Sequence, residues 1–312
     1  MHVHASPGHA PASRLDARRE DSRRRMRIAL AINLALVAVQ VAGGIVFGSL
    51  ALLADAGHLL SDVGSIFLGL FAAGIAARPA RARRTFGNQR SEVLAALVNG
   101  LALVAVAVLV AIAAIGRLGD PPDVDGGGVL ALGLLGLAGN MAATWVLARG
   151  ERGDLNLEGV LRHSAADALG SVGVIVAGTV VLAGGPEAAD PVVGLLIAAL
   201  VLASSWRLLT GPVDVLMEAA PPGLEMEDVG AAICSIQSVR SVHDLHVWTL
   251  TAGFPALSAH VVVTWDCDRD LARRRLEVML GERFSIEHTT LQMEEEAPAR
   301  LLSVEAPPAR RD

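Results

Sequence analysis

Six apolar runs of bilayer length fill most of the first 210 residues and limit what this chain can fold into. They span roughly residues 27–48, 51–77, 92–116, 128–148, 158–184 and 190–210, and a helix of about 20 residues crosses the hydrocarbon core of a membrane. Hydrophobic residues make up 53% of the 312-residue chain, more than soluble domains usually contain. We therefore expect a polytopic α-helical membrane protein with six transmembrane helices.

Arginines mark alternate connectors between these runs. They cluster before the first run, between the second and third runs, and between the fourth and fifth, whereas the other connectors are acidic or uncharged. Because positively charged connectors stay on the cytoplasmic side, we predict that both termini are cytoplasmic. The short loops and the lack of Lys and Tyr fit a bacterial inner membrane.

A more polar region follows Pro212. Residues 225–296 contain a helix with an acidic first turn, two strand-like segments rich in β-branched residues, an amphipathic helix and a last strand-like segment. The order αββαβ predicts a two-layer α/β domain with its helices on one face of a sheet. Cys234 and Cys267 show no disulfide framework and no CxxC spacing, so we expect free thiols.

Ionisable side chains recur inside two of the apolar runs. His58 and Asp62 lie four residues apart in the second run, and His163 and Asp167 repeat this spacing in the fifth. Residues at i and i+4 project from the same face of a helix. An ionisable group inside a membrane is costly and normally faces a bundle interior or a wet cavity. Two such helices, face to face, offer two imidazoles and two carboxylates to one ligand.

This donor set predicts a metal site. Two neutral imidazoles and two carboxylates suit tetrahedral Zn²⁺, and two Asp charges neutralise a divalent cation, although ligand preference among zinc, cadmium and cobalt is graded. The alternative is that each His–Asp pair only ties helices together by hydrogen bonds. Asp55, on nearly the same face as His58, is expected to support the ligands or line the entrance to the site, or else to cap the start of its helix.

Uncharged polar residues also occur at helix depth. We expect them to form hydrogen bonds between helices first and to line a pathway second. They are Asn33, Gln40, Asn99 and Asn140.

Several enzyme chemistries lack their motifs in this sequence. The apolar runs contain no Glu-x-x-His, which counts against a di-iron oxidase. Neither a hydrolase nucleophile elbow nor a phosphate-binding P-loop occurs. We therefore expect no enzyme activity, no nucleotide as energy source and no nucleic-acid partner.

From about residue 27 to residue 294 the chain resembles the cation diffusion facilitator family, in its zinc-transporting branch. The resemblance implies a homodimer of six-helix subunits, each with a ferredoxin-like cytoplasmic domain, exchanging metal for protons. It places the transport site on His58, Asp62, His163 and Asp167, and the His at the first position favours zinc over manganese. The similar stretches are SLALLADAGHLLSDVGS, TFGNQRSEVLAALVNG, LRHSAADALGSVGVI, ADPVVGLLIAALVL, VHDLHVWTL, LSAHVVV and EHTTLQME.

The chain departs from the family pattern in three places. The connector RPARARRTFGNQ lacks the His and Asp that hold a further metal in some relatives, so we expect no metal there. Ala113 stands where many relatives have an acidic residue. The connector ARGERGDLN lacks the histidines found in relatives. These changes concern metal capture before transport.

The polar region carries histidines that suggest a second metal site. By resemblance, His243 and His260 match positions that bind metal at the dimer face of the domain, and His288 and Glu294 match less closely. The alternative is a purely structural role on the strands. The expected division of the chain is an N-terminal arm (1–26), a transport domain (27–212), a cytoplasmic metal-binding and dimerisation domain (213–296) and a disordered tail (297–312).

Together these features predict a divalent-cation efflux transporter, most simply for Zn²⁺, driven by proton antiport with alternating access. Zinc needs ionised carboxylates and neutral imidazoles, so protons and metal compete for the same side chains. Two other readings stay open. A membrane-anchored zinc sensor would use the cytoplasmic histidines, and a membrane metalloenzyme would need an open coordination position and a substrate cleft.

Overall fold

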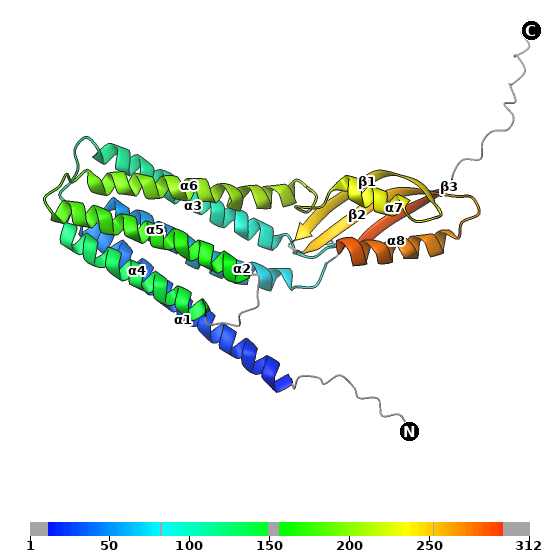
Figure 1. The fold of residues 1–312 in the computed structure, drawn as a ribbon, viewed down its shortest axis with the longest axis horizontal. Helices are drawn as coiled ribbons and strands as arrows, with labels where there is room; N and C mark the ends of the chain where they lie inside the picture. The colour runs from blue at the N-terminus through cyan, green and yellow to red at the C-terminus, as the bar shows by residue number, and fades with distance from the viewer. Residues whose placement is uncertain (1–11, 82, 149–155, 252, 296–312) are drawn as a thin grey trace, which may run out of the picture. The chain divides into compact units, whose positions relative to one another are not determined.

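The structure, a computed structural model, describes residues 12–81, 83–148, 156–251 and 253–295 (Figure 1). Within these ranges it does not describe the side chains of residues 12–23, 26, 147–148, 156–166 and 207. The chain forms two compact units. One consists of Met1–Ile75 with Leu94–Thr210, and the other of Ala76–Val93 with Gly211–Asp312.

Six long helices appear in the expected order, which confirms the predicted six-helix architecture. Five carry stretches long and apolar enough to cross a membrane, and the described side chains of the fifth helix include a shorter apolar stretch, Asp167–Leu182. The helices are α1 (Ala12–Val46), α2 (Leu50–Ala76), α3 (Ser91–Arg117), α4 (Gly126–Ala148), α5 (Asn156–Leu182) and α6 (Ala189–Leu216).

The first helix differs from the expectation at its start. The sequence predicts a helix from about residue 27, after an arm, but α1 already begins at Ala12. Six of residues 12–26 are Arg, which has high helix propensity, so the helix continues through the arginine-rich segment.

The helices of the first unit enclose a core of small and medium apolar side chains, while large apolar side chains are exposed on the outside. The buried core draws on α2 to α6, with Leu52, Leu103, Val129, Val174 and Ile197 among its members. Exposed apolar residues occur along several helices, including Phe71, Leu109, Leu134 and Leu196. An apolar exterior of this extent marks a surface for lipid rather than water.

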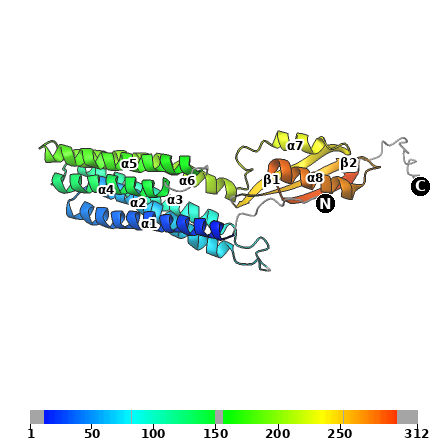
Figure 2. The same ribbon diagram turned by 60° about the horizontal axis from the view of Figure 1, so that its bottom comes forward.

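Helices α4 and α5 lie side by side, and α1 packs against α4 (Figure 2). A Cβ atom added at Gly178 of α5 would lie 2.5 Å from the backbone nitrogen of Leu130 in α4. Only glycine allows the two backbones to approach this closely, as is common between helices in membranes.

The start of α2 is anchored by a buried carboxylate from α6. Asp190 is 1% exposed and accepts hydrogen bonds from Ser49 Oγ at 2.5 Å and from the backbone N–H of Leu50 at 2.6 Å. Just before the start of α2, the carbonyl oxygen of Gly48 accepts a hydrogen bond from Arg117 of α3 at 2.6 Å. A carboxylate at helix N-termini is favoured by the positive ends of their dipoles. This end of α2 is therefore fixed to α3 and α6.

The second unit contains a three-stranded sheet in the order β1–β2–β3. Strands β1 (Val239–Thr251) and β2 (Phe254–Val263) are antiparallel, and β3 (His288–Glu295) is parallel to β2. A parallel neighbour requires a crossover connection, and α8 (Arg269–Phe284) provides it. With α7 (Met226–Cys234), the chain order is αββαβ, which confirms the prediction.

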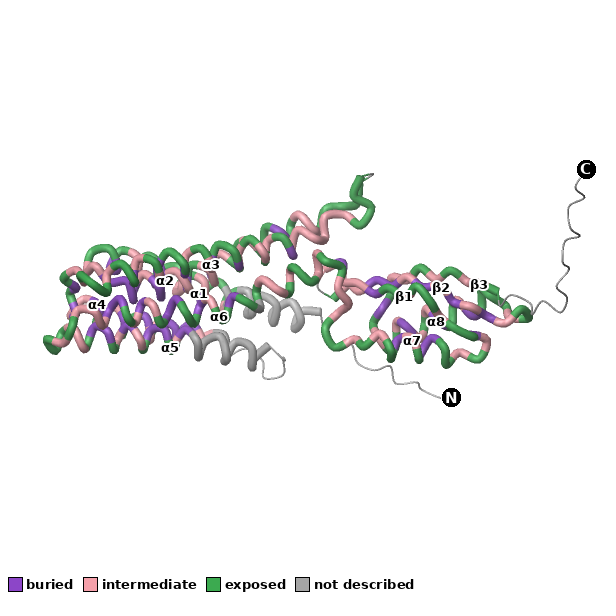
Figure 3. Tube along the Cα trace, turned by 90° about the horizontal axis from the view of Figure 1, so that it is seen from above, coloured by how far each residue is buried: buried purple, intermediate pink, exposed green. Residues whose placement is uncertain are grey.

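Both helices of this unit cover one face of the sheet, where the buried segments gather (Figure 3). The core joins Val229 and Ile233 of α7, Leu276 and Leu280 of α8 and inward-facing strand residues such as Leu257. Helix α8 begins where Asp268 accepts a hydrogen bond from the backbone N–H of Leu271 at 3.0 Å, a regular N-cap.

The connector between α2 and α3 belongs to this second unit. Arg90 pairs with Glu218 at 3.3 Å, and Thr251 Oγ1 donates to Glu92 Oε2 at 3.1 Å. The ring of Phe86 lies 5.4 Å from that of His288. From its arginines, the sequence predicted only that this connector faces the cytoplasm. The structure shows in addition that it contacts residues of the second unit.

We expect Gly178→Ala to destabilise the protein, because the new methyl group would force α4 and α5 apart. Overpacking of this kind typically costs about 1–3 kcal/mol, so the thermal unfolding midpoint of the purified protein in detergent should fall. Gly69→Ala is the matched control, since nothing lies within 4 Å of a Cβ atom at that position of α2. A midpoint for Gly178→Ala equal to that of Gly69→Ala would contradict the close packing.

Candidate metal centres

The first centre begins on α2, where His58 and Asp62 are one turn apart. The side chain of His58 is 17% exposed and its Nε2 lies 3.0 Å from Oδ1 of Asp167 on α5. Asp167 is buried, with 8% of its surface exposed. The two helices thus bring the imidazole of one and the carboxylate of the other into direct contact inside the first unit.

One donor atom from each of His58, Asp62 and Asp167 lies within 4.8 Å of the other two. Zinc–nitrogen and zinc–oxygen bonds are about 2.0–2.2 Å long, so two donors of one tetrahedral ion lie about 3.3–3.6 Å apart. Small side-chain rotations would bring all three donors onto one cation. His163 lies on α5 four residues before Asp167, but its side chain is outside the described residues.

Three of the polar residues at helix depth form hydrogen bonds between helices, as the sequence predicted. Asn99 of α3 bonds to Ser61 of α2 at 3.2 Å. Asn140 of α4 bonds to Ser171 of α5 at 3.3 Å. Gln40 of α1 donates to Asp55 of α2 at 2.8 Å.

Asp55 is fully buried beside the first centre but outside its three-residue group. Its partners are Gln40 and the hydroxyl of Ser171, at 2.8 and 3.4 Å. Among the described residues it bonds to no backbone N–H at a helix start, and that of Leu50 bonds to Asp190 instead. The carboxylate therefore lines the bundle interior next to His58.

The second centre lies on the sheet, where paired strands place His243 of β1 directly opposite His260 of β2. Side chains directly opposite one another share a face, and the two imidazole rings lie 5.0 Å apart. Glu294 of β3 joins them, with Oε2 3.0 Å from His243 Nε2 and Oε1 2.8 Å from His260 Nδ1. Three of the four predicted cytoplasmic residues are thus brought together.

Asp244 is a further donor that sequence reasoning missed. It forms a group with His243 and His260 in which one donor atom of each lies within 4.8 Å of the others. Strand alternation would point neighbours His243 and Asp244 to opposite faces. The register shifts between His243 and His246, and Asp244 has a φ of 49°, so a bulge changes its direction. Only the unusual pairing of His and Asp in VHDL signals this residue in the sequence.

His288 lies apart from this group. Its ring contacts those of Phe86 and Phe254, at 5.4 and 5.9 Å between centroids. The structure therefore does not bring His288 together with His243, His260 and Glu294.

The hydrogen bonds from the histidines also set the charge state of the second centre. The bond with His243 is the main cause that lowers the pKa of the Glu294 carboxyl from its ordinary value of 4.5, and bonds with His260 and Gln292 add to it. Glu294 therefore stays ionised into mildly acidic solution. An ionised carboxylate and two imidazoles are donor groups of the kinds that bind Zn²⁺.

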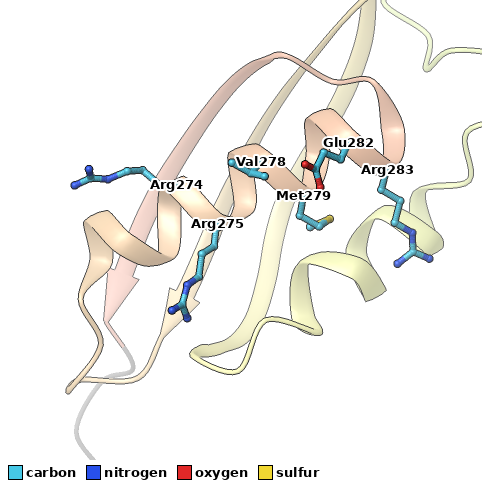
Figure 4. Close-up of a pocket in the computed structure, with 6 residues that line it drawn as sticks. All are labelled: Arg274, Arg275, Val278, Met279, Glu282 and Arg283. Carbon is cyan, nitrogen blue, oxygen red and sulfur yellow. The ribbon is translucent and has the colours of Figure 1, made fainter. Parts of the chain in front are cut away.

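A hollow of about 370 Å³ on α8 does not resemble either centre (Figure 4). Its lining contains three arginines and one carboxylate, and no His or Cys. Such a set repels a cation, so the hollow is not a metal site. The lining residues are Arg274, Arg275, Val278, Met279, Glu282 and Arg283.

Comparison with known proteins identifies the class of this chain. Residues 26–217 match the family described as cation efflux transmembrane domain, and residues 221–296 match the cytoplasmic domain of cation efflux proteins. The chain belongs to the cation efflux family. The family is the one that the sequence motifs indicated as cation diffusion facilitators, so that prediction is confirmed. This cation efflux protein is a multi-pass membrane transporter and not an enzyme.

Relatives match the cation efflux protein over most of its length. It is 39% identical over 277 residues to the zinc transporter ZitB of Shigella flexneri, covering 88% of both chains. It is 37% identical over 261 residues to a cadmium, cobalt and zinc/H(+)-K(+) antiporter of Bacillus velezensis, covering 82% of this chain and 83% of that one. Identity to the metal cation efflux system protein CzcD of Cupriavidus metallidurans is 36%, with 87% and 86% covered.

The lowered pKa of Glu294 predicts a pH-dependent contribution to stability. The folded state stabilises the ionised form of Glu294 more than the unfolded state does. This contribution to stability is therefore present above pH 4.5 and is lost as the pH falls through the lowered pKa. With metal chelated, the difference in thermal unfolding midpoint between the wild type and Glu294→Gln should be positive at pH 5 and shrink in stronger acid.

A His243→Ala background serves as the control, because it removes the main partner of Glu294. There the pH-dependent part of the difference should become smaller. A difference between wild type and Glu294→Gln that does not vary with pH would contradict the assignment.

Proposed function

We propose that this cation efflux protein exports Zn²⁺ from the bacterial cytoplasm across the inner membrane in exchange for protons. The transport site would consist of His58, Asp62, His163 and Asp167. The observation that carries the proposal is the convergence of His58, Asp62 and Asp167 from two membrane helices. The printed names of relatives support it, since one is a zinc transporter and another an antiporter of zinc, cadmium and cobalt with H⁺ and K⁺.

Ligand chemistry accounts for the exchange. A cation at this site needs His58 neutral at its coordinating nitrogen and Asp62 and Asp167 ionised. His58 Nε2 and Asp167 Oδ1 lie 3.0 Å apart, within hydrogen-bond distance, so a proton and a metal ion would compete for the same two atoms. Metal binding displaces protons, and protons displace metal. No nucleotide is needed for this competition.

Transport then follows from access rather than from covalent chemistry. When the site opens to the neutral cytoplasm, its ligands lose protons and bind Zn²⁺. When the helices rearrange and the site opens to the other side, protons release the metal and return with the ligands, as in alternating access. The arginine-rich connectors support a topology with both termini in the cytoplasm.

The second centre serves regulation in this proposal. His243, His260 and Glu294, with Asp244, would bind Zn²⁺ when its cytoplasmic concentration rises. The protein would act as a homodimer through its cytoplasmic domain, consistent with the motifs of that domain. Glu294 supports a ligand role because its two oxygens already contact both imidazoles.

We expect zinc flux into proteoliposomes to increase with an imposed pH gradient and to fall to the level of empty vesicles in Asp62→Asn. The substitution keeps the shape of the side chain but removes one of the charges that neutralise Zn²⁺. Flux is measured with a zinc-sensitive dye trapped in the vesicles. The purified wild type and the variant are compared at equal amounts of reconstituted protein.

Asp120→Asn is the matched control, because it removes a carboxylate from an exposed position after α3. It should transport at the wild-type rate. Wild-type flux in Asp62→Asn would disprove the site assignment. A folded wild type that binds zinc without any flux would instead favour a membrane-anchored zinc sensor that uses His243 and His260.

A further inference from the structure

A carboxylate whose hydrogen-bond donors are neutral groups lies one turn from the proposed transport site. Asp55 is 1% exposed, and its hydrogen-bond donors among the described residues are two neutral groups, Gln40 Nε2 at 2.8 Å and Ser171 Oγ at 3.4 Å. Among the described residues no Arg or Lys pairs with it. A buried carboxylate with neutral donors alone is costly in a low-dielectric interior. A cation beside Asp55 would remove that cost.

Gln40 gives a second sign that a cation could bind here. Its side chain is 1% exposed, and its Oε1 is buried without a hydrogen-bond partner while its Nε2 is bonded to Asp55. A buried acceptor left unpaired costs about 1–3 kcal/mol. Because Nε2 of the same amide donates to Asp55, the unpaired oxygen lies near the carboxylate.

Four helices contribute to this region, which we call the Asp55 cluster: Gln40 of α1, Asp55 of α2, Asn140 of α4 and Ser171 of α5. Asn140 Nδ2 donates to Ser171 Oγ at 3.3 Å. A Cβ atom at Gly170 would lie 2.7 Å from Asp55 Oδ1, so glycine is needed for α5 to pass this close to the carboxylate. All the polar atoms of the cluster are oxygen ligands or amide donors.

The cluster lies on one side of the transport site along both helices. Asp55 precedes His58 by three residues on α2, and Ser171 follows Asp167 by four on α5. Spacings of three and four keep the same helix face. Successive membrane spans alternate in direction, so both steps lead toward the end of the bundle where α2 begins. In the proposed topology, this end opens away from the cytoplasm.

We infer that the Asp55 cluster is a second, all-oxygen binding station for the divalent cation on its way out of the transport site. Asp55, Gln40 Oε1 and Ser171 Oγ would bind the ion in turn after His58, Asp62 and Asp167. Imidazole is a better ligand for zinc than neutral oxygen, so the station holds the ion more weakly and favours release. This inference rests on the proposed function, because it assigns one step of that transport.

Asp55→Asn separates binding from release. The variant keeps the size and hydrogen bonding of the side chain and removes its charge. We expect zinc affinity at the transport site, measured by equilibrium binding to the full-length protein in detergent, to change by less than about threefold, while flux into proteoliposomes falls at least about tenfold. Ser205→Ala is the control, since this buried hydroxyl bonds only within α6, and it should transport normally.

Either of two results would overturn the inference. Wild-type flux in Asp55→Asn would show that the charge is not needed. A parallel fall of affinity and flux would show that Asp55 only supports the transport ligands. If Asp55→Asn does not fold, as judged by size-exclusion chromatography, Gln40→Met decides between the same outcomes, because it removes the unpaired oxygen at nearly constant volume.

A binding measurement separates failure of this inference from failure of the proposed function. In the variant with Asp167→Asn and His260→Ala, both metal centres are disabled, and we expect one weak zinc site per chain that disappears when Asp55→Asn is added. This holds even if the wild type shows no flux. Residual zinc binding that is unchanged by Asp55→Asn, or no residual binding at all, would overturn the station.

Discussion

The cost of burying a carboxylate among apolar helices governs the membrane unit, and the structure meets it in three ways. Asp190 receives backbone and hydroxyl hydrogen bonds at a helix start, a permanent arrangement that anchors α2. Asp167 contacts Nε2 of His58 at 3.0 Å. Asp55 has neutral donors only. The first carboxylate fixes two helices to each other, and in the proposed function the other two bind the transported cation.

The cytoplasmic centre reaches a similar set of ligands through a sheet. Antiparallel pairing sets His243 opposite His260, and the parallel strand β3 brings Glu294 beside both. In helices the spacing of four residues aligns the donors, whereas in strands the register does so. Because the register of β3 depends on the crossover through α8, the centre exists only when the whole αββαβ unit is folded.

The six helices, the αββαβ order and most of both centres were predictable because they depend on local periodicity and on costly residues at regular spacing. His58, Asp62 and Asp167 follow from the i to i+4 rule. The place of Asp244 was not predictable from the sequence, because a bulge reverses the alternation of side chains that a strand pattern assumes. The contact of Asp190 with the start of α2 joins residues 140 positions apart, and the place of His288 between two phenylalanines depends on packing. No single-sequence pattern encodes such distant contacts.

Because the start of α2 is fixed by hydrogen bonds, a tilt of this helix would pivot about that end. With a rise of 1.5 Å per residue, His58 lies about 12 Å and Asp62 about 18 Å from Leu50, where Asp190 holds the backbone. Any tilt of α2 about this point displaces Asp62 about one and a half times as far as His58, and Asp55 least of all. At the proposed transport site, Asp62 would therefore move further from its partners than His58 does, so the proposed coordination would open from one side.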